Sequence, residues 1–171
     1  MLGYVQVYTG NGKGKTTAAM GLAIRAAGAE LNVFIGQFIK TGQYSELKAL
    51  KRFCDLITVE QFGLGYFLNK QPAQIDIDAA QEGLERIKEV FAAREADLVI
   101  LEEANVAVKR GLISIEDLLS LIDNKPDDVE VVITGRAAHE KLIERADLVT
   151  EMKDIKHYIH QGVRARIGIE K

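Results

Sequence analysis

One segment near the amino terminus constrains the fold more than any other part of the sequence: residues 9–17 read TGNGKGKTT. The β-branched and aromatic residues at 4–8 predict a strand before it. The helix formers at 18–27, which end at Gly28, predict a helix after it. A glycine-rich loop between a strand and a helix is the setting of a phosphate-binding loop, so we expect this segment to hold the phosphates of a nucleotide.

The residue types of this loop suit a polyanion for physical reasons. Glycines lack a Cβ, so neighbouring N–H groups can converge on one phosphate, and the helix that follows adds its unpaired amides and positive dipole end. Lys15 supplies a point charge for the terminal phosphates, and the Thr16 hydroxyl is a typical Mg²⁺ ligand. The predicted nucleotide-binding residues of the loop are Gly10, Asn11, Gly12, Lys13, Gly14, Lys15, Thr16 and Thr17.

The loop departs at one position from the usual pattern Gly-x-x-x-x-Gly-Lys-Ser/Thr. Gly14, Lys15 and Thr16 match it, but Thr9 stands at the place of the first glycine and Gly10 follows. A different loop shape and a phosphate chain held in another way are two interpretations of this departure. A glycine- and lysine-rich turn without a ligand is a third, which the flanking strand and helix disfavour.

The composition favours one globular domain over residues 1–171. The chain is 47% hydrophobic and 27% charged, which is ordinary for a soluble domain with a full core. Its net charge of −3, without a long basic run, argues against nucleic acid as the main partner. The sequence contains no run of about 18 apolar residues, so we predict no membrane span. Cys54 is the only cysteine. We therefore expect a cytoplasmic protein without an internal disulfide.

Further apolar runs predict the rest of the sheet and its connections. Those that read as strands are residues 32–39, 56–59, 96–101, 128–133 and 147–152. Those that read as helices are residues 45–53, 75–94, 115–122 and 139–145. Near-continuous apolar strands that alternate with helices are typical of a parallel sheet covered on both faces. We predict an α/β fold with a mostly parallel sheet of about six strands and helices on both faces, the P-loop NTPase (RecA-like) architecture.

Charged residues at two predicted strand ends are further site candidates. Glu102 and Glu103 follow the strand at 96–101, where a P-loop fold carries an acid that holds Mg²⁺ directly or through water. The first such acid is commonly aspartate, so either glutamate is a candidate metal ligand here. The alternative interpretation is that both are surface acids that bind no metal. Arg136 lies just beyond the strand at 128–133 and is a candidate to bind the negative charge of a phosphate. The alternative is that it forms a surface ion pair.

Two segments are less regular. Residues 61–72 combine aromatics, glycines and polar residues, and loops of this length are usually functional. We interpret them as a loop that closes over a flat apolar ligand, or as one that packs its aromatics into the core. Residues 156–170 mix histidine and basic residues and then alternate like a strand. His157 and His160 are three residues apart, a spacing that suits two ligands of one metal ion, but the sequence offers no third ligand nearby. We therefore favour a segment that caps the crevice or forms an oligomer contact.

The ordered set of these motifs resembles the P-loop type of ATP:corrinoid adenosyltransferases, which share the shifted first glycine. Each motif is weak alone, but the set is specific because it follows the family's order along nearly the whole chain. The matching segments are residues 7–19, 37–40, 101–105, 133–136, 146–152, 156–157 and 162–165.

The resemblance implies transfer of the 5′-deoxyadenosyl group of ATP to Co(I) of a corrinoid, with release of triphosphate, in adenosylcobalamin biosynthesis or salvage. The substrates are then ATP and a corrinoid, with Mg²⁺ as cofactor. No protein nucleophile or base is needed, because Co(I) is itself a strong nucleophile. A homodimer and a reductant, for which a flavoprotein is a candidate, are the implied partners.

The resemblance also carries roles to individual residues. Glu103 matches the family's metal-linked glutamate, whereas Glu102 stands where the family commonly has aspartate. Tyr66 and Leu68 correspond to corrinoid-facing positions, the second of which is often tryptophan in the family. Arg136, with Lys13 and Lys15, would neutralise the departing triphosphate.

Two other functions are compatible with a phosphate-binding loop. A kinase for a small metabolite needs a base near the γ-phosphate and an acceptor site, and the sequence shows no obvious candidate for either. A nucleotide-gated corrinoid-binding module would bind ATP without group transfer. The products separate the three functions, because the transferase releases triphosphate, the kinase releases ADP and the binding module releases neither.

Overall fold

The computed structural model describes residues 2–65 and 71–170. The strands are β1 (Val5–Thr9), β2 (Val33–Gln37), β3 (Ile57–Gln61), β4 (Leu98–Glu102), β5 (Glu130–Thr134) and β6 (Leu148–Glu151). The α-helices are α1 (Lys15–Ala27), α2 (Ser45–Leu50), α3 (Gln74–Ala93), α4 (Ala104–Lys109), α5 (Ile115–Asp123) and α6 (Glu140–Arg145). Two short 3-10 helices are η1 (Lys51–Phe53) and η2 (Tyr158–Gln161).

Within the described residues, the strands form one six-stranded sheet in the order β3-β2-β4-β5-β1-β6. Every neighbouring pair is parallel, which confirms the predicted α/β class and makes the sheet wholly parallel. The carboxyl ends of parallel strands share one edge of a sheet, and ligands of open α/β sheets bind there. Only β5 separates β1, which leads into the glycine loop, from β4, which leads into the two glutamates.

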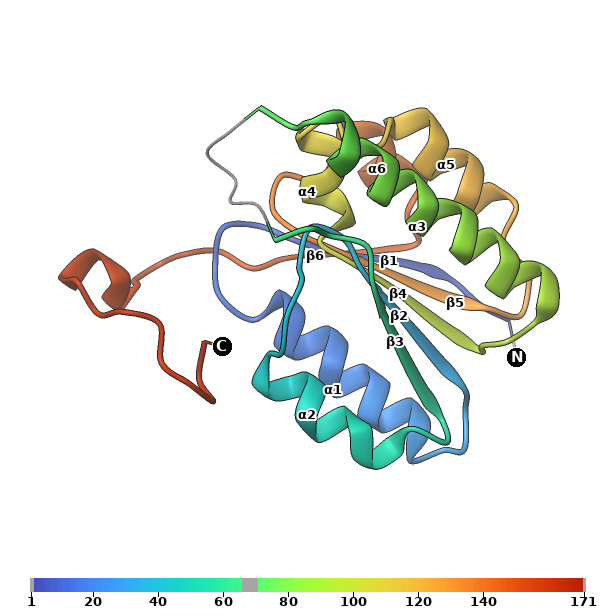
Figure 1. Ribbon diagram of the computed structural model, residues 1–171, viewed down its shortest axis with the longest axis horizontal. Coiled ribbons are helices and arrows are strands. Elements are labelled where there is room, and N and C mark those ends of the chain that lie inside the picture. Colours follow the sequence, from blue (N-terminus) through green and yellow to red (C-terminus); the bar gives the residue numbers. More distant parts are fainter. Residues whose placement is uncertain (1, 66–70, 171) are drawn as a thin grey trace.

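Helices cover both faces of the sheet. Figure 1 shows α1 and α2 on one face and α3, α4, α5 and α6 on the other. The central strand β4 is buried on both sides: Ile100 belongs to an apolar cluster with Ala23 of α1, and Leu101 to a second cluster with Leu84 of α3. This burial explains why the strand is continuously apolar, and each such side chain contributes roughly 1.5–3 kcal/mol to folding.

Most predicted elements are confirmed within a few residues of their ends. The start of α5 is capped by Ser114, whose hydroxyl accepts a hydrogen bond from the Asp117 N–H at 2.9 Å. Helix α4 was not predicted because it is short and follows β4 almost directly. The chain turns from the strand into this helix at Glu103, which has a φ of 61°. Among the described residues, no helix has both the length and the apolar character needed to cross a membrane.

The strand-like reading of the tail is wrong. After η2, residues 162–170 contain no strand, and Figure 1 shows this segment leaving the sheet beyond β6. A strand needs a partner edge, but here the tail bonds to itself: the Glu170 N–H donates to the Arg166 carbonyl at 3.0 Å, and the Arg166 guanidinium pairs with Glu170. Alternating residue types therefore indicated a strand in a segment that pairs with no edge of the sheet.

Candidate functional site

A cleft of about 750 Å³ lies at the carboxyl edge of the sheet. It is lined by much of the glycine loop, by α1, by the segment that leads from β2 into α2, and by the carboxyl-terminal tail. The predicted site residues that line it are Asn11, Gly12, Lys13, Gly14, Lys15, Thr16, Thr17, Glu103 and Arg136. Gly10 and Glu102 are outside this lining, and Tyr66 and Leu68 lie outside the described residues.

The glycine loop is shaped by backbone packed against it from the end of β6. Gly10 has a φ of 95°, and a Cβ there would lie 2.4 Å from the carbonyl oxygen of Met152. The Gly12 N–H donates to the same oxygen at 2.7 Å, and a Cβ on Gly12 would also lie 2.7 Å from it. These two positions require glycine because a side chain would displace the segment that supports the loop.

Thr9, at the place of the first glycine in the usual pattern, has a structural role. Its side-chain hydroxyl accepts a hydrogen bond from the Ala138 N–H at 3.1 Å. That bond ties the glycine loop to the segment after β5, which carries Arg136. At the place of the first glycine, this chain therefore has a hydroxyl that connects the start of the glycine loop to the segment that follows β5.

Replacing Gly12 with alanine is expected to weaken ATP binding by about 10- to 100-fold, because the loop must move away from Met152 to accommodate the methyl group. Gly28→Ala is the matched control: its φ is −65°, and the nearest atom to a new Cβ lies at 3.4 Å, an ordinary contact. Calorimetric titration of both variants with ATP tests this. Wild-type affinity in Gly12→Ala would show that the loop shape is unimportant.

Lys15 lies folded over its own loop. Its Nζ donates to the carbonyl oxygens of Gly10 and Gly12, each at 2.7 Å, and the residue is only 8% exposed. Burial lowers the pKa of Lys15, the charge of Arg136 lowers it further, and Glu103 opposes both. No carboxylate of the described residues is hydrogen-bonded to this ammonium, so an anion in the cleft can bind it without displacing an ion pair.

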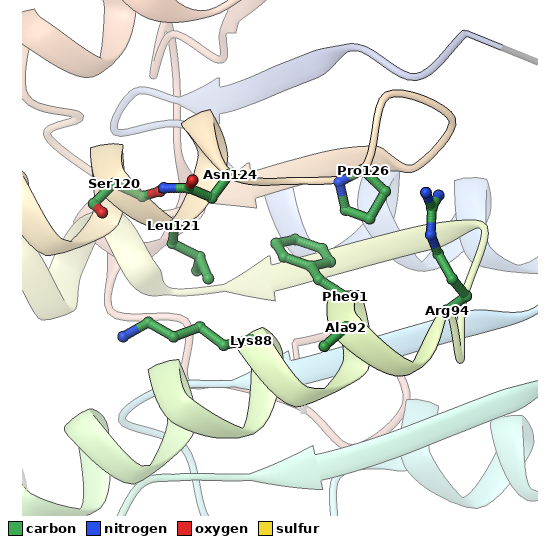
Figure 2. Close-up of a pocket in the computed structure, with 8 residues that line it drawn as sticks. All are labelled: Lys88, Phe91, Ala92, Arg94, Ser120, Leu121, Asn124 and Pro126. Atoms are coloured by element: carbon green, nitrogen blue, oxygen red, sulfur yellow. The ribbon is translucent and has the colours of Figure 1, made fainter.

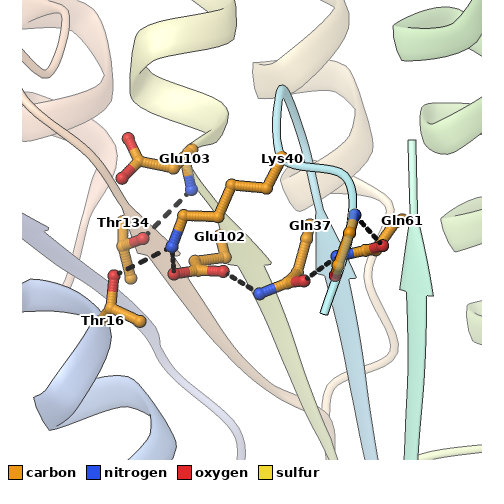
Figure 3. A network of polar contacts seen from close by, with 8 residues as sticks. Thr16, Gln37, Lys40, Gln61, Glu102, Glu103 and Thr134 are labelled. Carbon is orange, nitrogen blue, oxygen red and sulfur yellow. Dashed lines mark hydrogen bonds and ion pairs between the residues drawn. The ribbon is translucent and has the colours of Figure 1, made fainter. Parts of the chain in front are cut away.

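The two glutamates after β4 have different environments. Glu102 is fully buried: its Oε1 accepts from Lys40 Nζ at 2.6 Å, and its Oε2 accepts from Gln37 Nε2 (Figure 3). Glu103 lines the cleft, and its N–H donates to the Thr134 hydroxyl at 3.1 Å. Burial raises the pKa of Glu103, against the opposing charge of Lys40, so a cation beside this carboxylate would stabilise its ionised form.

Arg136 is held in the cleft wall by α4. The Asn105 amide donates to the Gly135 carbonyl at 3.1 Å, and a Cβ on Gly135 would lie 2.9 Å from the Cβ of Asn105. Gly135 has a φ of 132°, so the chain turns sharply before Arg136. Asn105 was recognised only as part of a motif, and its contact with Gly135 required the tertiary structure.

Sequence reasoning assigned no site role to Gln37 or Lys40. Gln37 is fully buried, and its Oε1 accepts from Gln61 Nε2 at 2.8 Å, which extends the polar chain toward the loop after β3 (Figure 3). Lys40 lines the cleft. A glutamine at the end of the apolar strand β2, followed three residues later by a lysine, was the available signal.

The tail forms one wall of the cleft. His157, Ile159, Ala165 and Glu170 line it, and Lys13 Nζ donates to the Ile169 carbonyl at 2.8 Å. His160 lies 3.3 Å from Asp154, but no group of three or more metal-ligating side chains occurs in the parts of the chain that the structure describes. The arrangement agrees with the predicted crevice cap more closely than with a zinc site.

The described part of the loop after β3 packs inward. Phe62 contacts the larger apolar cluster, and its ring centroid lies 5.8 Å from that of Phe38. This supports the core-packing interpretation for Phe62. Leu64, in contrast, is exposed.

A second hollow of about 490 Å³ lies between α3 and α5 (Figure 2). Its polar groups already have protein partners: Arg94 pairs with Asp128, Lys88 with Glu85, and the Asn124 amide with the Ser120 carbonyl. It has no glycine loop. The cleft at the carboxyl edge is therefore the better candidate site.

Comparisons with known proteins agree with this geometry. A family model described as ATP:corrinoid adenosyltransferase BtuR/CobO/CobP matches residues 1–170. A corrinoid adenosyltransferase of Pseudomonas aeruginosa is 36% identical over 98% of this chain and 83% of its own length. The corrinoid adenosyltransferase of Escherichia coli K12 is 35% identical, and the corrinoid adenosyltransferase CobA of Salmonella typhimurium is 34% identical, each over 98% of this chain and 85% of its own length. The chain therefore belongs to the ATP:corrinoid adenosyltransferase family.

Proposed function

We propose that this corrinoid adenosyltransferase binds the triphosphate of ATP along the glycine loop, with Lys13, Lys15 and Arg136 as its cations. The supporting observation is that these three cations and the amino-terminal end of α1 line one cleft. The unpaired amides of a helix start and nearby cations favour a polyanion. The loop residues from Gly10 to Thr17 would supply the backbone donors.

Mg²⁺ would be held by Thr16 and Glu103, both of which line the cleft. A hydroxyl and a carboxylate are hard oxygen donors, and Mg²⁺ usually adds only one or two protein carboxylates to phosphate and water ligands. Glu102 fits this role less well, because both of its oxygens already accept hydrogen bonds. When bound, the ion would stabilise charge on the leaving triphosphate.

In the proposed reaction, Co(I) of the corrinoid attacks C5′ of ATP. The Co–C5′ bond forms, the C5′–O5′ bond breaks, and the triphosphate leaves with the electron pair of the broken bond. The chain's own contribution is to hold C5′ in line with cobalt and to oppose the negative charge that develops on the triphosphate. This division of labour needs no basic side chain at the reacting carbon.

We propose that the corrinoid lies against the loop after β3, with Tyr66 and Leu68 facing it. Tyr66→Ala is then expected to leave the ATP dissociation constant within about twofold of wild type while lowering corrinoid turnover about tenfold, as for loss of one aromatic contact. ATP titration and corrinoid-dependent kinetics measure the two effects separately. An equal loss of ATP binding and corrinoid turnover would contradict this assignment.

A homodimer, a cytoplasmic location and a reductant of the flavoprotein class complete the proposal. Strand β6 supports the dimer, because it is an edge of the sheet and exposes Leu148 and Val149. Exposed apolar side chains on an edge strand favour contact with another chain. The reductant would supply the electron that converts Co(II) to Co(I).

Product analysis tests the proposed reaction. The protein is incubated with ATP, Mg²⁺ and chemically reduced cobalamin, and the products are separated by anion-exchange chromatography. We expect inorganic triphosphate and adenosylcobalamin in equal amounts. ADP would indicate phosphoryl transfer instead, and unchanged ATP with bound corrinoid would indicate a binding module.

A further inference from the structure

Lys40 brings a further cation into the cleft of the glycine loop. Its Nζ lies 2.6 Å from Glu102 Oε1 and 3.5 Å from the Thr16 hydroxyl oxygen (Figure 3). The same Nζ lies 5.3 Å from the centroid of the Tyr44 ring, which lines the cleft beside it. The side chain of Lys40 is 19% exposed, so its ammonium is held by protein on one side and accessible from the cleft on the other.

A buried polar network fixes this ammonium in place. Glu102 and Gln37 are both fully buried, and they bond to each other and onward to Gln61 (Figure 3). A buried carboxylate is costly unless it is paired, so Lys40 is held firmly. Burial alone would lower the pKa of Lys40, but the charge and hydrogen bond of Glu102 outweigh it, so the pKa is raised and the ammonium persists.

The backbone is also bent to aim Lys40 at this point. Ile39 has a φ of 69°, which is uncommon for a β-branched residue, and the Lys40 N–H donates to the Phe38 carbonyl at 2.7 Å in a tight three-residue turn. Gly63 packs directly on Ile39, since a Cβ there would lie 2.1 Å from the Ile39 carbonyl carbon. Strain of this kind persists where surrounding structure enforces it and is concentrated at functional sites.

We propose that Lys40 is a direct ligand of the triphosphate, with Glu102 as its positioning residue. The inference rests on the proposed placement of the triphosphate along the glycine loop. A phosphate oxygen near the Thr16 hydroxyl comes within hydrogen-bond reach of an ammonium 3.5 Å from that hydroxyl. Lys40 then opposes the charge of the leaving group from the β2 side, and its tie to Glu102 holds it there before ATP arrives.

The competing explanation is that Lys40 only neutralises Glu102. A pair of variants separates the two roles. Lys40→Met alone leaves a buried carboxylate unpaired, so both thermal stability and triphosphate affinity should fall. The double variant Lys40→Met/Glu102→Gln removes both charges and keeps an amide that can bond to Gln37, so it should recover the thermal stability. Lys48→Met, which removes an exposed lysine from α2, is the control for net charge.

The experiment is calorimetric titration of inorganic tripolyphosphate, with Mg²⁺, into each folded variant, together with thermal melting. We expect the double variant to melt near wild type yet bind tripolyphosphate about 10- to 100-fold more weakly, with Lys48→Met within about twofold of wild type. Wild-type affinity in the double variant would overturn the role of Lys40 while leaving the glycine-loop site intact. If the wild-type protein does not bind tripolyphosphate, the proposed placement of the triphosphate along the glycine loop is wrong, and so is the proposed role of Lys40.

Discussion

Replacing Lys15 with alanine is expected to lower kcat/KM for adenosyl transfer by about 1,000-fold, the scale seen when a key donor to developing charge is removed. The Lys15 ammonium is buried, and its hydrogen-bond partners among the described residues are the carbonyls of Gly10 and Gly12, so an incoming phosphate can bind it without breaking an ion pair. Steady-state kinetics with ATP and reduced cobalamin measure the loss.

The control for this variant is Lys51→Ala, which removes an exposed lysine of η1 and should keep wild-type activity. Circular dichroism should show that Lys15→Ala remains folded, because the residue belongs to neither apolar cluster. Full activity in folded Lys15→Ala would rule out the proposed phosphate site.

Replacing Glu103 with glutamine is expected to lower kcat/KM on the order of 100-fold and to raise the Mg²⁺ concentration needed for half-maximal activity. The change keeps the size of the side chain and removes only its charge. Because burial already raises the pKa of Glu103, the neutral amide should be tolerated by the fold. Activity measured across a Mg²⁺ series gives both quantities.

Glu116→Gln is the matched control, since Glu116 is exposed on α5 and forms an ion pair with Lys141 on the surface. It should show the wild-type Mg²⁺ dependence. If Glu103→Gln also keeps that dependence, then Glu103 is not a metal ligand in this reaction.

The local pattern of the chain was sufficient to predict the sheet and the glycine loop. Residues 10–14 join β1 to α1, as expected for a phosphate-binding loop, although α1 begins at Lys15, before the predicted start at residue 18. The continuous apolar run of β4 correctly indicated a strand covered on both faces. Both inferences depend on neighbouring residues in the sequence. Periodicity and loop chemistry carry that kind of information.

Features that depend on tertiary contact could not be predicted in this way. The contrast between Glu102 and Glu103 arises because Lys40 and Gln37, some 60 residues earlier, bond to Glu102. The direction of Lys40 depends on a positive φ at Ile39, a conformation that a β-branched residue rarely adopts. The tail was misread as a strand because residue alternation does not tell whether a sheet edge is within reach.

A crystal structure with ATP and Mg²⁺ tests the central claim most directly. We expect the triphosphate along the amides of residues 10–17, its oxygens within hydrogen-bond distance of Lys15, and the ribose C5′ facing the segment that follows β3. A cleft that stays empty at saturating ATP, or a ribose turned away from that segment, would contradict the account.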